Sequence, residues 1–544
     1  MKSNLRKKIA QMLLIRQYDI LQKTEVDENI ARSDKEIETL LSQNQFGGMW
    51  IMGNQKLNVV NMSGQNWGGY KPSSKEYAEF VNKLNAALEV PLLCGIDAEN
   101  GGGDVFNDLN NIVSAFAVGA ANDEQLAYDI GASVAKEIKS AGANWRWTPV
   151  VDIAGHFNSE RLGRAFSCNK EQLIRMSIAN IKGMQDNGVA ATAKHFPGCD
   201  PNEYRDTHIT VTRINTSLDD WKENQGDVFQ RMIDCGVYSI MIAHTAFPAV
   251  DNTKVNGKYL PATLSKKIVT GLLKNEMGFG GVVITDALNM GGLNGYYSYE
   301  KMIVELVNAG NDVLLGVNDF ATLDIIEGAV KNGEISEDRI NDAYLRIMEM
   351  KRKLGLLKKD FAIPELNKTN IEKTREINKK ISEKAMTLVC NRKKLIPVDE
   401  RKIHNIAVIC SVHSDDMYEK MKYIVKVLEK YGKRVHIQRR LKSREELKDI
   451  SNKNDLIIYC TYLGTHRPMG LPSFYGEEFS TFINALSYGA EKSIGVSLGN
   501  PNIHQDFLEN CDSFVNTYGY DKISIDLFVK AIFGEIEMNG IMPV

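Results

Sequence analysis

The chain has 544 residues, of which 43% are hydrophobic and 25% charged, and its formal net charge is −3. This length exceeds one ordinary core and predicts at least two domains, and the composition is typical of a soluble globular protein. The small net charge and the scattered basic residues argue against a nucleic-acid partner. The eight cysteines form no C-x-x-C pair, which favours free thiols in a reducing cytoplasm over a zinc site or a disulfide framework.

The N-terminal segment, MKSNLRKKIAQMLLIRQYDI, begins with basic residues and continues with an apolar stretch that Gln11 interrupts and Arg16 ends. We interpret it as an amphipathic helix and not as a cleaved signal. The longest apolar stretches elsewhere, such as Ile240–Ala243, fall far short of the roughly 18 residues that a membrane span needs. The sequence therefore predicts a cytoplasmic protein that does not enter a membrane.

Apolar, strand-like runs alternate with helix-like segments before residue 350. The clear runs are Gly47–Gly53, Pro91–Asp97, Asn144–Ile153, Val189–His195, Val237–His244, Val282–Asp286 and Val313–Gly316. About eight such units in roughly 250 or more residues predict an α/β fold with a closed (β/α)8 barrel of the TIM type. Polar side chains stand near the ends of these runs, on the face where barrel enzymes form their active sites: Asp97, Asp152, Lys194, His195, His244 and Asp286. We expect these residues to converge.

Residues 193–208, AKHFPGCDPNEYRDTH, are rich in side chains that transfer protons. Asp206 and His208 are two positions apart in extended chain, so the carboxylate can reach the imidazole and raise its basicity. The residue types also suit a metal site formed by His195, Cys199, Asp200, Glu203, Asp206 and His208. The adjacent Lys194 and the irregular spacing argue against a metal, so we expect neither a metal nor a cofactor.

The run GVVITDALNM at 281–290 brings Asp286 to the end of a buried strand. Such a carboxylate either caps the following helix or serves as a nucleophile or acid. The nucleophile becomes the more attractive alternative because the Asp206–His208 pair offers a separate acid and base.

The pattern changes after residue 355. We predict a barrel domain over residues 1–355, a charged linker over 356–384 that contains Pro364, and a smaller α/β sandwich domain over 385–544. Strand-like runs in the last segment alternate with helices: Ile406–Cys410, Val435–Gln438, Leu456–Tyr459, Ser493–Leu498 and Ser513–Asn516, with helices expected at 416–430 and 475–488.

Several motifs in a fixed order resemble glycoside hydrolase family 3, in its β-N-acetylglucosaminidase branch of the NagZ type. They are KHFPG at 194–198, DTH at 206–208, GVVITDALNM at 281–290, WTPVVDI at 147–153 and GRAFS at 163–167, with VSLGNP at 496–501 in the second domain. Many short motifs in one order are far more specific than any one of them.

This resemblance implies a retaining glycosidase that forms a covalent glycosyl-enzyme. Asp286 would be the nucleophile, His208 the acid and base, and Asp206 its partner. The positions expected to hold the terminal sugar are Asp97, Arg164, Lys194, His195 and His244. The expected substrate is a small carbohydrate such as a muropeptide or chitin fragment, and the expected state is a monomer or homodimer, with a role in cell-wall recycling.

The sequence departs from the family pattern in two loops. GIDAENGGGDV at 95–105 stands in place of D-x-E-G-G-R, and Cys199-Asp200 stands in place of His-Gly-Asp. Three alternatives remain open: a β-glucosidase with Glu477 or Glu478 of the second domain as acid and base, a phosphorylase, and an inactive sugar-binding homologue. Phosphorolysis is an alternative because a neutral imidazole, unlike a carboxylate, does not repel an anionic acceptor.

Overall fold

The structure is a computed structural model that describes residues 4–21, 32–52, 71–155, 159, 161, 163–317, 320–412, 414–462, 480, 481, 484, 492–499, 501 and 511–544. Within these residues, every helix is too short or too polar to cross a membrane.

Eight parallel strands form the sheet of the first domain, and their spatial order follows the chain. They are β1 (Leu13–Arg16), β2 (Gly48–Trp50), β3 (Leu93–Ile96), β4 (Trp145–Arg146), β5 (Ala190–Phe196), β7 (Ser239–Ile242), β11 (Val282–Thr285) and β12 (Leu314–Val317). β12 pairs with β1, and a bridge between Ile284 and Val313 joins the two remaining edges. The predicted (β/α)8 barrel is therefore confirmed.

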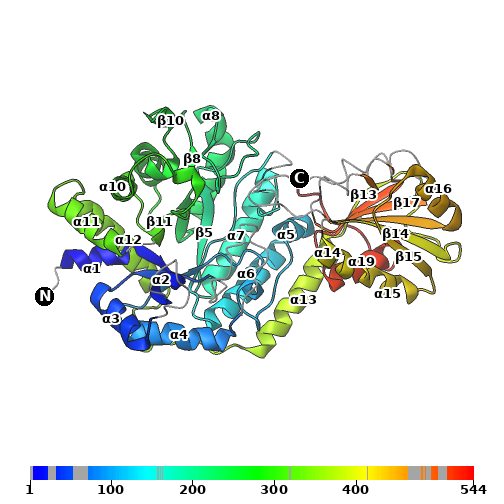
Figure 1. Cartoon of the computed structure of the whole chain (residues 1–544), viewed down its shortest axis with the longest axis horizontal. Coiled ribbons are helices and arrows are strands. Elements are labelled where there is room, and N and C mark those ends of the chain that lie inside the picture. Colours follow the sequence, from blue (N-terminus) through cyan, green and yellow to red (C-terminus); the bar gives the residue numbers. More distant parts are fainter. Residues whose placement is uncertain are drawn as a thin grey trace.

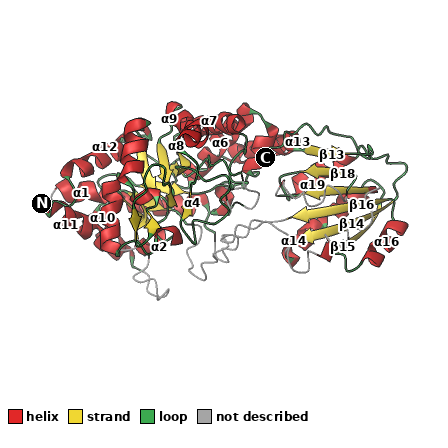
Figure 2. Ribbon diagram, turned by 90° about the horizontal axis from the view of Figure 1, so that it is seen from above, coloured by secondary structure: helices red, strands yellow, loops and turns green. Residues whose placement is uncertain are grey.

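Helices surround this barrel (Figures 1 and 2). The main ones are α1 (Asn4–Gln11), α3 (Asp34–Asn44), α4 (Ser74–Ala86), α5 (Ala115–Ala121), α6 (Glu124–Ser140), α7 (Lys170–Asp186), α9 (Asp227–Asp234), α10 (Tyr299–Ala309), α11 (Ala321–Lys331) and α12 (Glu337–Lys353). Side-chain caps mark several starts; Ser73, for example, accepts from the backbone N–H of Glu76 in a capping box. Each helix covers the sheet with its buried apolar face.

The N-terminal segment differs from its sequence interpretation. A helix does form over Asn4–Gln11, but Leu13–Arg16 is the first barrel strand, and the short helix α2 (Gln17–Leu21) follows it. A barrel strand needs only four residues, and a short apolar run of this length fits a buried strand as well as a helix.

The second domain is a six-stranded sheet in the order β13-β18-β17-β16-β14-β15, with β13 antiparallel to β18. The strands are β13 (Thr387–Asn391), β14 (Asn405–Val412), β15 (Arg434–Arg439), β16 (Leu456–Tyr462), β17 (Ser493–Ser497) and β18 (Ser513–Asn516). Ile406 and Val408 pack with helices α14 (Asp415–Met421), α15 (Tyr423–Glu429) and α19 (Lys522–Ile532), whereas Ala407 and Ile409 pack with α16 (Arg444–Lys453). Both faces of the sheet are thus covered, as the predicted α/β layers require.

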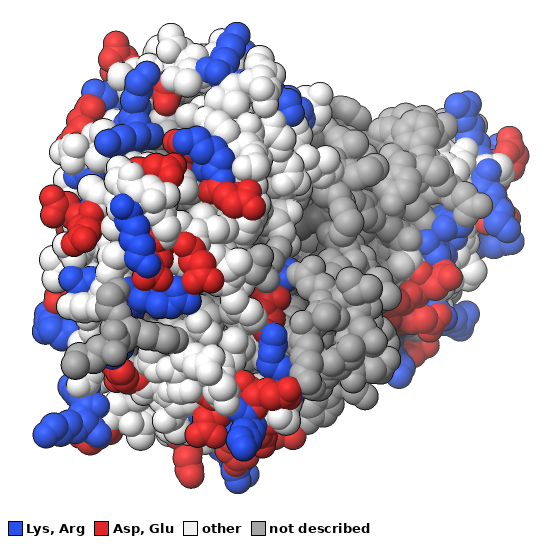
Figure 3. Space-filling model, turned by 60° about the vertical axis from the view of Figure 1, so that its left-hand side comes forward, with Lys and Arg blue, Asp and Glu red and all other residues white. Residues whose placement is uncertain are grey.

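The segment predicted as a linker contains helix α13 (Lys368–Ala385), which runs along the barrel toward the second domain (Figure 1). It packs against α5 and α6 of the barrel and against α19 of the second domain. Its buried side chains include Ile371, Ile377 and Ile381. Lys and Arg side chains are interspersed with Asp and Glu over the described part of the face in Figure 3.

Candidate active site

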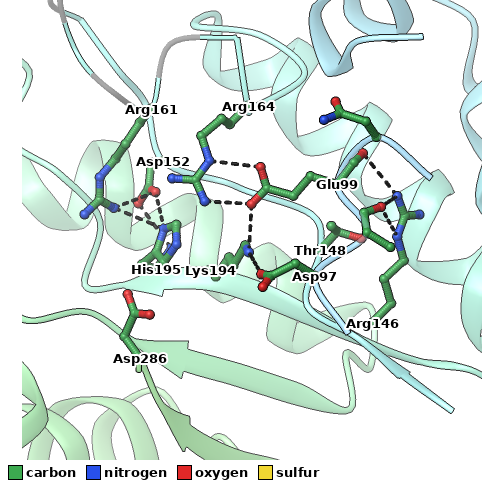
Figure 4. A network of polar contacts seen from close by, with 12 residues as sticks. Asp97, Glu99, Arg146, Thr148, Asp152, Arg161, Arg164, Lys194, His195 and Asp286 are labelled. Atoms are coloured by element: carbon green, nitrogen blue, oxygen red, sulfur yellow. Dashed lines mark hydrogen bonds and ion pairs between the residues drawn. The ribbon is translucent and has the colours of Figure 1, made fainter. Parts of the chain in front are cut away.

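Polar side chains gather at the carboxyl ends of the barrel strands. Asp97 follows β3, Lys194 and His195 lie in the last part of β5, His244 follows β7, and Asp286 follows β11. Parallel strands of a barrel end at the same face, so these residues surround one mouth, as the sequence predicted. Figure 4 shows most of them in one polar network, with Asp286 at its edge.

Two cations and two carboxylates form one half of this network, which we call the clamp: Asp97, Glu99, Arg164 and Lys194. Lys194 Nζ lies 3.1 Å from Asp97 Oδ1 and 2.8 Å from Glu99 Oε1. Arg164 binds the same Glu99 through two hydrogen bonds, of 3.0 Å from Nε and 2.6 Å from a terminal nitrogen. Lys194 is buried, whereas the Asp97 side chain is 51% exposed. The clamp thus offers charged hydrogen-bonding groups to a polyhydroxylated ligand.

His195 belongs to a second, buried group. Its Nδ1 lies 2.7 Å from Asp152 Oδ2, and Arg161 donates to the same oxygen at 2.6 Å. Burial alone would raise the pKa of Asp152, but the Arg161 charge and His195 hold it far below its usual value. Burial lowers the pKa of His195, although the neighbouring Asp152 carboxylate acts in the opposite direction.

Asp286 lies at the mouth beside these groups and is partly exposed. Its Oδ1 accepts a 2.8 Å hydrogen bond from the N–H of Ala287. Burial by itself would raise its pKa, but the imidazoles of His195, His244 and His208 lower it below the usual value. An ionised carboxylate near neutral pH is the form that a nucleophile requires.

Asp206 and His208 form the predicted dyad. His208 Nδ1 lies 2.6 Å from Asp206 Oδ1, which also accepts from the His208 backbone N–H at 2.8 Å. The Asp206 side chain is buried, while that of His208 is 42% exposed. This geometry holds the Nδ1 of the His208 ring on the carboxylate, so a proton transfer between the ring and a substrate would involve Nε2. Asp206 Oδ2 is buried without a hydrogen-bond partner in the described structure.

The His244 side chain is buried within the protein and not exposed at the barrel mouth. It is fully buried, with Nδ1 2.9 Å from Thr263 Oγ1 and Nε2 3.0 Å from the carbonyl oxygen of Ala287. Both nitrogens contact protein groups, so the geometry favours the structural role that shapes the pocket. Contact between His244 and a sugar stays a prediction.

Glu99 and Arg161 are site residues that the sequence reasoning did not select. Glu99 stands two positions after Asp97 in the same loop, and this spacing could have indicated that both carboxylates lie at the same site. Arg161 stands two positions before the GRAFS segment, and no sequence pattern indicates its ion pair with Asp152. Glu477 and Glu478, the alternative acid and base, lie outside the described residues. Over the residues that the structure describes, His, Cys, Asp and Glu form no group of three or more arranged to hold a metal ion.

A closed barrel with a carboxylate and an Asp–His dyad at its mouth belongs to the class of (β/α)8-barrel enzymes. The glycosyl hydrolase family 3 N terminal domain matches residues 4–350. The chain therefore belongs to glycosyl hydrolase family 3 and is an enzyme of the glycoside hydrolase class. The resemblance seen in the sequence is confirmed.

Two named relatives match different shares of the chain. The beta-N-acetylglucosaminidase/beta-glucosidase of Cellulomonas fimi is 23% identical over 495 residues, which span 87% of this chain and 86% of that protein. The beta-hexosaminidase A of Pseudoalteromonas piscicida is 29% identical over 348 residues, or 59% of this chain and 55% of that protein.

Two solved structures share the fold. One is the beta-glucoside phosphorylase BglX bound to 2FGlc, with a TM-score of 0.82 and 23% identity; the match covers 100% of this chain and 94% of that one. The other is a glycoside hydrolase family 3 beta-N-acetylglucosaminidase from Paenibacillus sp. str. FPU-7, with a TM-score of 0.78 and 24% identity, covering 99% and 98%. The two-domain arrangement is thus a known family fold.

Proposed function

We propose that the chain is a retaining exo-β-N-acetylglucosaminidase, which removes terminal β-linked N-acetylglucosamine from small fragments of cell wall or chitin. The observation that carries this proposal is the Asp206–His208 contact of 2.6 Å, on a loop whose backbone is hydrogen-bonded to the loop that follows Asp286. The names of relatives that specify N-acetylglucosaminidase or hexosaminidase activity support the proposed sugar.

In the first step, a carboxylate oxygen of Asp286 attacks the anomeric carbon, and the bond from that carbon to the glycosidic oxygen breaks. The glycosidic oxygen keeps the bonding electron pair and takes a proton from His208 Nε2. Asp206 stabilises the charged imidazolium before this transfer, because Nδ1 donates to its carboxylate.

In the second step, the neutral imidazole takes a proton from water while the water oxygen attacks the anomeric carbon. The bond to Asp286 breaks, the carboxylate is restored, and the configuration is retained after two inversions. The clamp holds the terminal sugar throughout: Lys194 and Arg164 donate to its oxygens, and Asp97 accepts from its hydroxyls.

The test replaces the acid and base. We expect His208→Ala to lower kcat/KM for an unactivated β-N-acetylglucosaminide by about 100-fold or more, and to affect a dinitrophenyl glycoside much less, because that leaving group departs without a proton. Azide, which attacks without a general base, should restore deglycosylation and give a glycosyl azide.

His436→Ala is the matched control, since His436 is exposed on β15 of the second domain. If His208→Ala leaves turnover of both substrates intact, the dyad is not the acid and base. A parallel assay on β-glucosides, with Glu478→Ala, tests the β-glucosidase alternative. Turnover of either substrate by the unaltered enzyme contradicts an inactive sugar-binding protein.

Phosphorolysis is the second candidate. After it gives up its proton, the acid and base is a neutral imidazole and not a carboxylate, so an anionic acceptor meets no like charge there. The phosphorylase among the structures of similar fold supports this alternative. Product analysis distinguishes the two reactions, because phosphorolysis gives a sugar 1-phosphate only when phosphate is present.

A further inference from the structure

We propose that Gly291 and Gly292 are positioning residues that hold the acid/base loop at the nucleophile. They follow Asp286 on the loop after β11 and begin the short 3-10 helix Gly291–Leu293. This inference rests on the proposed function, because it explains how the Asp206–His208 dyad is placed for that reaction.

Backbone hydrogen bonds join the two loops at this glycine pair. The N–H of Gly291 donates to the carbonyl oxygen of His208 at 2.8 Å, and the N–H of Gly292 donates to that of Thr207 at 3.1 Å. The acceptors are the acid/base residue and its neighbour. The loop that carries His208 is thus attached directly to the loop that begins with Asp286.

The approach of the two backbones is too close for a side chain. A Cβ atom on Gly291 would lie 2.2 Å from the carbonyl oxygen of Ile209 and 2.9 Å from that of His208. On Gly292 it would lie 2.9 Å from the carbonyl oxygen of Thr207 and 2.9 Å from the Cβ of His244. These are distances that real Cβ atoms do not adopt, and most of the neighbours are backbone atoms, so a substitution must push the acid/base loop away.

His244 makes the opposite side of this contact rigid. Its ring bonds Thr263 on one side and the carbonyl of Ala287 on the other. A side chain at position 292 would therefore lie between the buried, hydrogen-bonded His244 and the backbone of the acid/base loop at Thr207. Of these two neighbours, the loop with its exposed His208 is the one with room to move.

Displacement of this loop has a specific kinetic consequence. It moves His208 away from the glycosidic oxygen while Asp286, the clamp and His195 keep their own contacts. Misplacement of a catalytic group by about 1 Å can cost about 100-fold in rate. We therefore expect a lower rate only for the steps in which His208 donates or accepts a proton.

The experiment compares Gly291→Ala and Gly292→Ala with Gly280→Ala, a matched control where an added Cβ meets nothing within 4 Å. For each variant, kcat/KM is measured on an unactivated β-N-acetylglucosaminide and on the dinitrophenyl glycoside, and azide is added to the second assay. We expect the glycine-pair variants to lose about 10- to 100-fold on the first substrate and less than about threefold on the second. Azide should accelerate their turnover.

Equal losses of kcat/KM on both substrates, without an effect of azide, would mean that the glycine pair only supports the fold. Unchanged kinetics would mean that the pair does not position His208. Either result overturns the inference. Thermal unfolding identifies a variant that fails to fold. In that case the kinetics of the other glycine variant test the inference. His208→Ala serves as the reference: if it lacks the leaving-group dependence, the proposed function fails, and if it alone shows that dependence, only the role of the glycine pair fails.

Discussion

Glu99 is shared between two cations at the barrel mouth. Arg164 and Lys194 both bind its carboxylate, and Lys194 is almost completely buried. Without this shared charge, the guanidinium and the ammonium would repel each other in a place where water screens them poorly. Glu99 therefore determines whether the two donors stay close enough to hold one sugar.

We expect Glu99→Gln to lower kcat/KM by about tenfold or more, chiefly through KM, and to reduce stability by roughly 3 kcal/mol, because it leaves two cations with one partner too few. Steady-state kinetics and urea unfolding measure the two effects. Glu124→Gln is the control, since its pair with Arg175 at 2.9 Å is exposed and contributes little. Equal KM values for Glu99→Gln and the unaltered enzyme would contradict this role.

At the residue scale, sequence reasoning found the groups that strands deliver. Asp97, Lys194, His195 and Asp286 stand beside apolar runs, and parallel strands bring such positions to one face. Arg161 was not predictable in this way. Its contact with Asp152 joins two residues outside the regular strands and helices, and such residues carry no periodicity that reveals their partners.

At the element scale, Lys351 is an unusual member of helix α12. The side chain is fully buried, and Nζ donates to Gln11 Oε1 at 2.6 Å, at the end of α1. Burial lowers the pKa of this lysine to about 7. An unfolded lysine has a pKa of about 10.4, so the barrel takes up a proton when it unfolds between these two values.

The sign of the pH effect follows from this shift. Below pH 7 the folded barrel carries the full cost of a buried charge, and stability rises with pH up to about 10.4, where the lysine is neutral in both states. We expect Lys351→Met to remove this rise, so that the difference in stability between variant and unaltered enzyme changes by about 4 kcal/mol between pH 6.5 and 10.

Urea unfolding followed by tryptophan fluorescence measures this change, because the tryptophans within the described residues, Trp50, Trp145, Trp147 and Trp221, all lie in the barrel domain. Lys359→Met is the control, since Lys359 is exposed. A pH dependence that Lys351→Met leaves unaltered would show that another group causes it.

The elements also show the limits of periodicity. Most strands with clear apolar runs were predicted within a few residues, because flanking glycines and polar residues mark their ends. The predicted run Asn144–Ile153 is an exception, since β4 ends already at Arg146. β1 was hidden because Leu13–Arg16 directly follows an amphipathic helix, and its four residues alone have no helix or strand signal. Only the pairing of Leu13–Arg16 with β12, which closes the barrel, identifies these residues as a strand.

At the scale of the whole molecule, the C-terminal part of the chain contacts the barrel domain at helix α5 and at the loop before helix α7. Ser114 Oγ donates to the carbonyl oxygen of Tyr518 at 2.8 Å, and the N–H of Ile541 donates to that of Ala120 at 2.9 Å. The carbonyl oxygen of Pro543 accepts from Ser167 Oγ at 2.9 Å and from the N–H of Cys168 at 2.6 Å. Sequence patterns predicted two domains in this order, but not these contacts, which join residues more than 370 positions apart.

The Pro543 contact holds the loop that carries Arg164, one of the four clamp residues. Ser167 is the last residue of the GRAFS segment that contains Arg164, Cys168 follows it directly, and Ser167 is fully buried. If the tail orients this loop, removal of Pro543 and Val544 should raise KM by about tenfold and leave kcat within about threefold, because Asp286 and the Asp206–His208 dyad lie on other loops. Removal of Val544 alone keeps Pro543 and its acceptor oxygen, so that variant should match the unaltered enzyme. If the variant without Pro543 and Val544 has the same KM as the variant without Val544 alone, the tail covers the loop but does not position it.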